Sequence, residues 1–243
     1  MKRRDLLVLG GIIAGIATVQ GLLRRRDRDF VFDPLDDLPP FRRLETGAVT
    51  ATDPLLIGLD SPTEARLDLR AAIRADPAAA LFRDPPPGAL PIAAFTDYNC
   101  AFCPQMSRTL VELGQARDDI HLSWHDLPLL GPGSDRAARA AVAADLQGAY
   151  LPVHEALMRT NLRPGPAALR ALAEGHGLDP DRMVADAAGP QVAARIDTAH
   201  AMADVLGLAG TPATVVGRTI VLGRLERDDL DRLIALERAA PAI

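Results

Sequence analysis

Both cysteines of this 243-residue chain, Cys100 and Cys103, lie within one four-residue segment. The run before them, residues 91–96 (PIAAFT), is short and apolar, which is typical of a buried strand. After them, apolar side chains recur at helical spacing, at Met106, Leu110, Val111 and Leu113. We therefore predict an α/β domain in which the cysteine pair lies where a buried strand passes into a helix.

The rest of the pattern predicts the order strand-helix-strand, a block of helices, and then strand-strand-helix. A helix is expected over residues 61–82, interrupted near Pro77, and residues 120–125 alternate between apolar and polar types as a half-buried strand does. Residues 132–207 contain successive capped helical segments. Two short apolar runs flank Gly217 like a hairpin, and an amphipathic helix closes the chain.

The N-terminal segment has the composition of an export signal. Basic residues precede and follow an uncharged run over residues 6–23, which as a helix would be about 27 Å long, about the thickness of a membrane's hydrocarbon core. We predict that residues 1–26 anchor the chain in the inner (cytoplasmic) membrane or, alternatively, form a cleaved signal peptide. Residues 27–60 are expected to be a linker with short ordered pieces, a spacer between the membrane and the domain. Either alternative places the domain in the periplasm or another extracytoplasmic space.

The charge composition excludes several functional classes. A formal net charge of −5 argues against nucleic acid as a partner, because phosphate binding needs a basic face. Lys2 is the only lysine, so no interior lysine is present for a P-loop, a kinase site or a Schiff base.

A structural disulfide and a metal site are the two alternatives to a reactive cysteine pair. A disulfide across about four residues would contribute only about 2 kcal/mol by the loop formula, which is a weak reason for this spacing. His121 and His125 follow Cys100 and Cys103 in a pattern that resembles a Cys₂His₂ zinc site. On a strand, however, four residues span about 13 Å, so the two imidazoles would converge on one ion with difficulty. We predict no metal or other cofactor, a polar strand face for His121 and His125, and surface positions for the other histidines, His154, His176 and His200.

The reactive alternative follows from the position of the thiols. The unpaired N–H groups and the positive end of the dipole at a helix N-terminus stabilise a thiolate over a thiol. We therefore expect Cys100 to be the acidic, exposed nucleophile. Cys103, one turn further, is expected to be shielded and to resolve the mixed disulfide that forms at Cys100.

Three segments of the chain resemble the DsbA-like thiol:disulfide interchange proteins of bacteria. They are LFRDPPPGALPIAAFTDYNCAFC, LPLLGPGSDRAARAAVAADLQGAYLPVHEALM and GTPATVVG, in the order of that family. The resemblance covers residues 61–240 and implies a thioredoxin-like domain with an inserted helical domain, with boundaries at 61–131, 132–207 and 208–243. It also implies that Pro212 is a cis-proline that places Thr211 beside the cysteines, where the backbone of Thr211 pairs with a bound peptide in strand fashion.

Two departures from this family pattern concern how the pair is tuned. Ala101 and Phe102 stand between the cysteines, where the best-known DsbA oxidants carry proline and histidine, and we expect them to tune the redox potential. Ala94 occupies the position of a buried acidic residue that some members have, six residues before Cys100. The resemblance predicts a dithiol oxidase that acts on cysteines of exported proteins and is regenerated by a membrane or thiol redox partner. A disulfide reductase or isomerase, or a copper- or zinc-binding thiol domain, is the alternative.

Overall fold

One mixed sheet forms the centre of the fold in this computed structural model, which describes residues 30–45, 50–51, 64–160 and 165–240. Within these residues the strand order is β1-β2-β8-β7-β4-β5. The strands are β1 (Asp33–Pro34), β2 (Arg42–Glu45), β4 (Leu90–Thr96), β5 (Ile120–Asp126), β7 (Ala213–Val216) and β8 (Thr219–Leu222). A separate pair of short strands consists of β3 (Thr50–Ala51) and β6 (Gly210–Thr211).

Strand β4 leads to the cysteine pair, which follows its end, and lies between β5, which runs parallel to it, and β7, which runs antiparallel. The hairpin of β7 and β8 turns at Gly217, whose φ of +53° belongs to the left-handed region that glycine adopts without strain. The hairpin predicted around this glycine is therefore confirmed.

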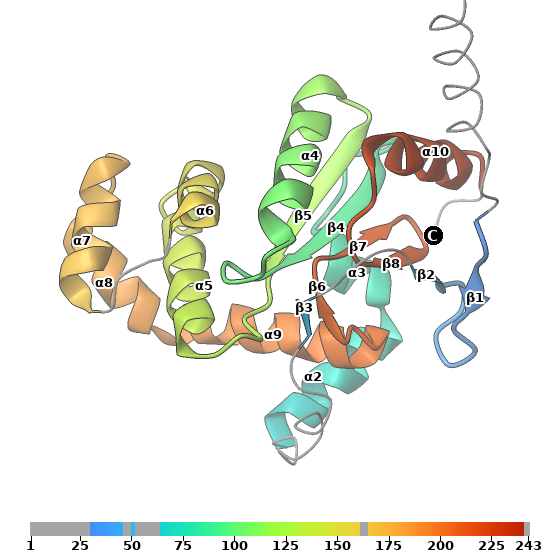
Figure 1. Cartoon of the computed structure of the whole chain (residues 1–243). Coiled ribbons are helices and arrows are strands. Elements are labelled where there is room, and N and C mark those ends of the chain that lie inside the picture. Colours follow the sequence, from blue (N-terminus) through green and yellow to red (C-terminus); the bar gives the residue numbers. More distant parts are fainter. Residues whose placement is uncertain (1–29, 46–49, 52–63, 161–164, 241–243) are drawn as a thin grey trace, which may run out of the picture. The chain divides into compact units, whose positions relative to one another are not determined.

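Helices cover both faces of the sheet (Figure 1). One face carries α4 (Cys103–Ala116) and α10 (Arg227–Arg238); the other carries α2 (Glu64–Ala75), α3 (Pro77–Phe82) and α9 (Pro190–Leu206). The break predicted near Pro77 separates α2 from α3, where the Asp76 side chain caps α3 by accepting from the Ala79 N–H at 3.0 Å. Residues 61–63 lie outside the described residues.

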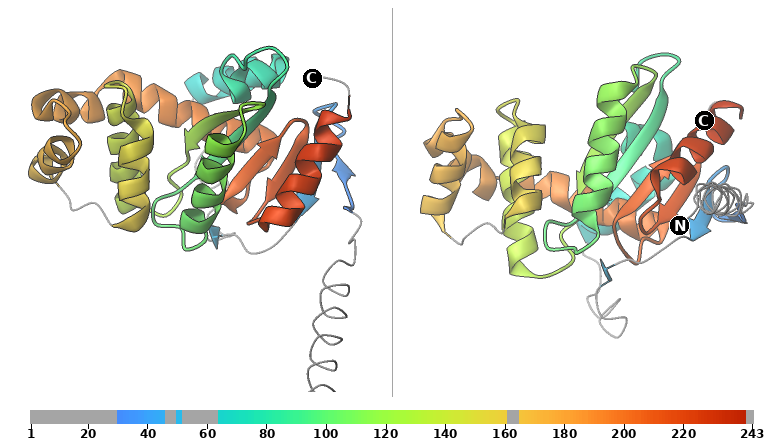
Figure 2. Two further views of the ribbon diagram at one scale, coloured as in Figure 1. Left: turned by 90° about the horizontal axis from the view of Figure 1, so that it is seen from above. Right: turned by 45° about the horizontal axis from the view of Figure 1, so that its top comes forward.

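The helical block lies between β5 and β6 in the chain. It consists of α5 (Pro132–Asp145), α6 (Tyr150–Arg159), α7 (Pro166–Gly175), α8 (Pro180–Ala188) and α9. Buried alanines such as Ala140 and Ala141 let neighbouring helices approach α5 closely. Figure 2 shows α5 to α8 beside the sheet, with α9 running from them to α2. Met202 and Leu206 on α9 belong to the core beneath the sheet, so this helix joins the insertion to the rest of the fold.

Part of the predicted linker belongs to the folded domain. Residues 42–45 form β2, which pairs in parallel with β8, and Leu38, Phe41 and Leu44 are buried. Arg42 donates to the buried Glu237 carboxylate at 2.7 Å and to the Thr219 hydroxyl at 2.9 Å. This ordered piece of the predicted linker is thus part of the domain's sheet and core, which the sequence did not indicate because its pairing partners lie far away along the chain.

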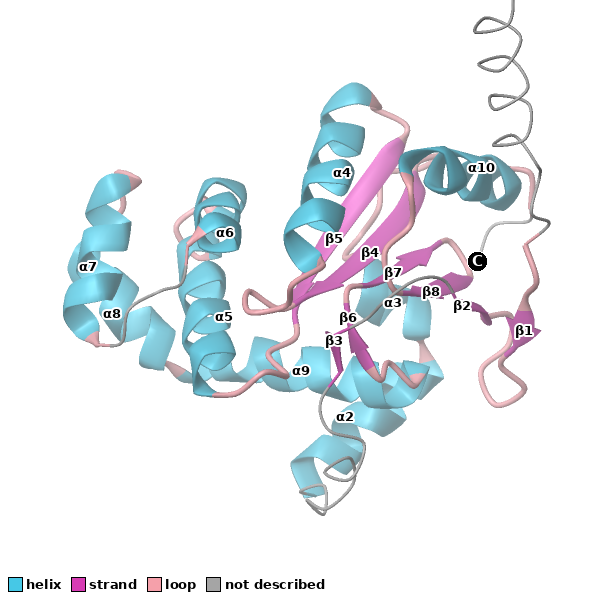
Figure 3. Cartoon of the chain, viewed as in Figure 1, coloured by secondary structure: helices cyan, strands magenta, loops and turns pink. Residues whose placement is uncertain are grey.

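Strand β5 differs from its prediction in burial. The expected half-buried strand has helices on both of its faces, and Ser123, Trp124, His125 and Asp126 are all buried (Figure 3). The predicted polar face is thus wrong for His125, whose Nε2–H donates to the Leu81 carbonyl at 2.8 Å.

The predicted membrane segment, residues 6–23, lies outside the described residues. Of the helices that the structure does describe, none combines the length and the apolar character needed to cross a membrane.

Candidate active site

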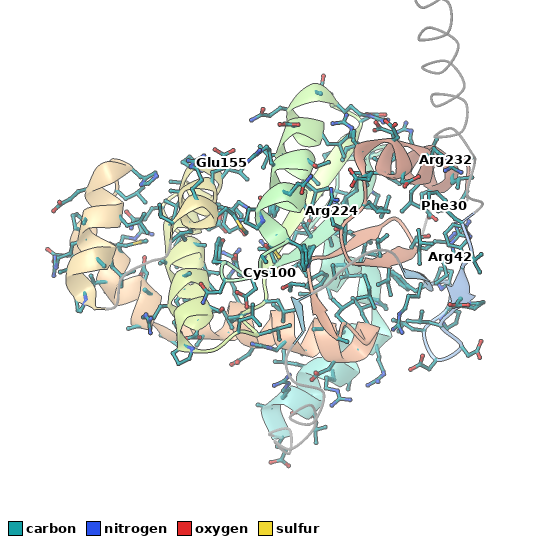
Figure 4. All side chains as sticks on the ribbon, in the orientation of Figure 1. Phe30, Arg42, Cys100, Glu155, Arg224 and Arg232 are labelled. Atoms are coloured by element: carbon teal, nitrogen blue, oxygen red, sulfur yellow. The ribbon has the colours of Figure 1, made fainter. Side chains whose placement is uncertain are left out.

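The two thiols lie at the junction that the sequence predicts, but the helix begins later than expected. Strand β4 ends at Thr96, and α4 begins at Cys103 with Phe102 as its N-cap residue. Cys100 therefore precedes the helix, in a turn closed by its N–H donating to the Asp97 carbonyl at 3.1 Å. Figure 4 shows Cys100 close to the N-terminal end of α4.

Both cysteines are buried, with 2% of Cys100 and 1% of Cys103 exposed. The shielded position expected for Cys103 is confirmed, and the exposed position expected for Cys100 is wrong. The Cys100 thiol donates instead to the carbonyl oxygen of Thr211 at 3.2 Å, across 111 residues of sequence. The fold thus places a distant segment directly against the sulfur.

That distant segment contains the cis peptide bond expected from the family resemblance, between Thr211 and Pro212. Thr211 is the second residue of β6 and is fully buried. The structure therefore brings together Cys100, Cys103 and the Thr211–Pro212 segment. Ala101 is exposed and Phe102 is half-buried between the cysteines, and the Phe102 side chain gives α4 no capping hydrogen bond.

The Cys103 thiol does not ionise easily. Burial raises the pKa of the Cys103 thiol well above its ordinary value, and the neighbouring Cys100 raises it further. The backbone of Asp97 and the hydroxyl of Thr96 oppose this by lowering the pKa of Cys103. Cys103 is consequently held in its thiol form, which favours Cys100 as the first sulfur to react.

The Asp97 carboxylate holds the turn that leads to Cys100, and only 1% of this residue is exposed. Its Oδ1 accepts from the Asn99 N–H at 2.8 Å and from the Ser134 hydroxyl at 2.6 Å. Its Oδ2 accepts from the N–H groups of Leu129 and Leu130 at 2.7 and 3.0 Å. One buried side chain therefore ties the active-site turn to the start of the helical insertion.

A buried polar network lies between α4, β5 and α6, and the sequence reasoning missed it. Asp126 Oδ1 accepts from the hydroxyls of Tyr98 at 2.7 Å and Tyr150 at 3.0 Å. His154 is fully buried, 3.0 Å from the Tyr98 hydroxyl through Nδ1 and 2.5 Å from the Ser107 hydroxyl through Nε2. The surface position predicted for His154 is therefore wrong. A signal was present, because residues 150, 153, 154 and 157 share one face of a helix.

Burial dominates the ionisation of this network. It raises the pKa of Asp126 to about 6, against hydrogen bonds from Tyr98 and Tyr150 that lower it. It also lowers the pKa of His154 to about 4. At neutral pH His154 is thus uncharged. The Tyr98 hydroxyl donates its proton to Asp126, so Nδ1–H of His154 must donate to the Tyr98 oxygen. The other ring nitrogen, Nε2, then accepts from the Ser107 hydroxyl.

The residues of the alternative metal site are engaged elsewhere. His125 is bonded to a backbone carbonyl and stacks on Phe95 with ring centroids 4.9 Å apart, and His121 lines a surface cavity beside Trp124. In the part of the chain that the structure describes, no group of three or more His, Cys, Asp or Glu side chains is placed to hold a metal ion.

Comparison with known proteins places this site in a family. The family model described as a DSBA-like thioredoxin domain matches residues 91–235, a range that includes both cysteines and the Thr211–Pro212 segment. A thioredoxin-like oxidoreductase from Silicibacter pomeroyi DSS-3 is 33% identical with a TM-score of 0.59, over 68% of this chain and 99% of that one. A periplasmic thioredoxin-like protein from Salmonella enterica serovar Typhimurium is 26% identical with a TM-score of 0.57, over 74% of this chain and 100% of that one.

A longer relative matches most of the chain. The Na(+)/H(+) antiporter NhaA 1 of Salinispora arenicola (strain CNS-205) is 31% identical over 181 residues, which is 74% of this chain. The chain spans only about a quarter of that protein's length, 26%, so the similarity concerns that part alone. The family match over most of the folded region agrees with the mixed sheet, the helical insertion and the cysteine pair. The chain therefore belongs to the family of DSBA-like thioredoxin domains.

Proposed function

We propose that the protein is a dithiol oxidase that exchanges disulfides with cysteines of exported proteins through Cys100 and Cys103. The observation that carries this proposal is the contact of the Cys100 sulfur with the Thr211 carbonyl beside a cis-proline. A substrate segment paired along Thr211 in strand fashion would have its own cysteine close to Cys100. No cofactor is needed, because the two thiols carry both electrons.

The reaction begins with the disulfide form of the pair. A substrate thiolate attacks Cys100 Sγ, the Cys100–Cys103 bond breaks, and Cys103 leaves with the electron pair and takes up a proton. A second substrate thiolate then attacks the substrate sulfur of the mixed disulfide and releases Cys100. The substrate gains a disulfide, the pair gains two electrons, and a membrane or thiol redox partner reoxidises it. In the reverse direction Cys103 resolves the mixed disulfide, as a reductase or isomerase requires.

The proposed location is extracytoplasmic. It is supported by the export-like composition of residues 1–26 and by the similarity to a periplasmic thioredoxin-like protein. We propose that residues 6–23 anchor the chain in the cytoplasmic membrane. Fractionation of the full-length chain tests this: it should remain with the membranes after high-salt and carbonate washing, and its recovery in the soluble periplasmic fraction would indicate a cleaved signal instead.

The direction of exchange is tested with the purified folded domain. It should oxidise a reduced unfolded protein faster than it reduces insulin, and the Cys100→Ser variant should do neither. If only insulin reduction is found, the oxidase assignment fails. The roles are tested separately: Cys103→Ser should accumulate mixed disulfides through Cys100, and trapping through Cys103 in Cys100→Ser would reverse them.

A further inference from the structure

The strand edge beside the active site is the starting point. Strand β6 is only two residues long, and it ends at the carbonyl that contacts the Cys100 sulfur at 3.2 Å. Under the proposed function, on which this inference rests, the backbone of Thr211 is the place where an extended substrate pairs. An occupant of this edge therefore lies next to the reactive sulfur.

The edge is already occupied by the chain itself. Strand β3 pairs antiparallel with β6, with Thr50 opposite Thr211 and Ala51 opposite Gly210 (Figure 3). These residues come from the N-terminal side of the domain, more than 150 positions away from β6 in the sequence. Their backbone forms the kind of pairing that a peptide substrate would form there.

The accessibility of the site agrees with an occupied edge. Cys100 is only 2% exposed and both residues of β6 are buried, although a nucleophile must meet a protein substrate. The pairing of β3 with β6 is short, because each strand has only two residues. Each net backbone hydrogen bond changes an equilibrium by only about fivefold, so such a pairing can be displaced.

We infer that residues 50–51 act as a built-in competitor that occupies the substrate edge of β6 and must leave before a substrate strand can pair there. Because the competitor is part of the same chain, it acts at an effective concentration in the millimolar range. It therefore raises the substrate concentration that the enzyme needs without changing the chemistry at Cys100. It also excludes weakly pairing peptides and thiol reagents from the sulfur.

The test compares two double variants of the full-length chain. In Thr50→Pro/Ala51→Pro, β3 loses both of its N–H groups and cannot donate to β6. In the matched control, Thr50→Val/Ala51→Val, both N–H groups remain and the residues favour a strand. Two measurements are made on each variant. The first is the rate at which iodoacetamide alkylates Cys100, in reduced protein that also carries Cys103→Ser. The second is the KM and kcat for oxidation of a cysteine-containing peptide, in protein that keeps Cys103.

The proline variant should be alkylated at least fivefold faster than the parent and show a lower KM with an unchanged kcat. The valine control should not exceed the parent in either measurement. Amide hydrogen exchange should rise for residues 210–211 in the proline variant alone, which is measurable even if that variant is less active. Alkylation within twofold of the parent, together with unchanged exchange at residues 210–211, would overturn the inference. If the proline variant is alkylated faster but neither it nor the parent oxidises the peptide, the inference that residues 50–51 cover Cys100 stands and the proposed function fails.

Discussion

Replacing Asp97 by asparagine should destabilise the fold by about 4 kcal/mol. The carboxylate accepts four hydrogen bonds in a site that is 99% buried, three of them from backbone N–H groups. Bonds to a charged acceptor contribute about 1.5–3 kcal/mol each, and neutral ones contribute about 1 kcal/mol. The substitution removes one acceptor oxygen and the charge but hardly changes the volume.

The best orientation of the amide keeps its oxygen toward Leu129 and Leu130, which weakens two bonds by about 1 kcal/mol each. The amide nitrogen then faces the other two donors. The Ser134 hydroxyl can turn to accept from it, but the Asn99 N–H meets another donor and is left unpaired, at about 1–3 kcal/mol. These costs sum to about 3–5 kcal/mol, and the easier burial of a neutral group offsets a part of them.

Urea unfolding of the folded domain, followed by circular dichroism, measures this loss, and the melting temperature should fall by about 8–16 °C. Asp97→Ala, which leaves all four donors unpaired, should lose more. Asp231→Asn is the matched control: its exposed pair with Arg227 at 2.9 Å should be worth less than about 0.5 kcal/mol. A loss below 1 kcal/mol for Asp97→Asn would refute the idea that the charge of this carboxylate holds the active-site turn.

Three further predictions concern buried groups. Burial lowers the pKa of His125 to about 3 and of His154 to about 4, so the unfolded state binds more protons below pH 6.5 and stability is lost on acidification. Between pH 7 and pH 4.5 the two histidines together should lower the free energy of unfolding by about 5 kcal/mol. Asp126, whose pKa is raised to about 6, should restore about 2 kcal/mol of this as it protonates. In urea titrations the free energy of unfolding of Asp126→Asn should therefore fall more steeply with decreasing pH than that of the parent, and an equal pH dependence would contradict the assignment. Glu237→Ala should cost about 3 kcal/mol in the same assay because it leaves buried donors facing no carboxylate, whereas a loss under 1 kcal/mol would show that water replaces it. Thr96→Val should slow resolution of mixed disulfides by Cys103 and leave alkylation of Cys100 unchanged; equal resolution rates would show that the hydroxyl does not assist that sulfur.

Much of the fold could be predicted because local signals mark the element boundaries. Pro77 separates two helices, Gly217 turns a hairpin and Gly207 ends α9 in a left-handed conformation, each for a reason confined to its neighbours. Strand β2 could not be found in this way. Its four residues, RRLE, have no strand alternation, and they form a strand because β8, about 175 residues further on, offers a parallel edge.

The site shows the same division between local and distant causes. The pair of cysteines and its junction could be predicted from the sequence, whereas the contact with Thr211 was expected only from the family resemblance. The burial of His154 depends on an acidic residue at the end of β5 and on Ser107 of α4. A polar cluster of this kind has no pattern along the chain, because its members come from separate elements.

The order of reaction of the two thiols stays a prediction, but the structure changes its physical basis. The sequence argument relied on a helix N-terminus to activate an exposed Cys100, yet α4 begins only at Cys103 and Cys100 is buried against Thr211. The structure supplies a different basis, which is that burial and the adjacent sulfur raise the pKa of Cys103 and suppress its ionisation. We therefore predict that Cys100 reacts first because ionisation of Cys103 is suppressed. On the inference above, a substrate would reach Cys100 only after residues 50–51 leave β6. A variant that exposes Cys100 should thus react faster without any change in which sulfur reacts first.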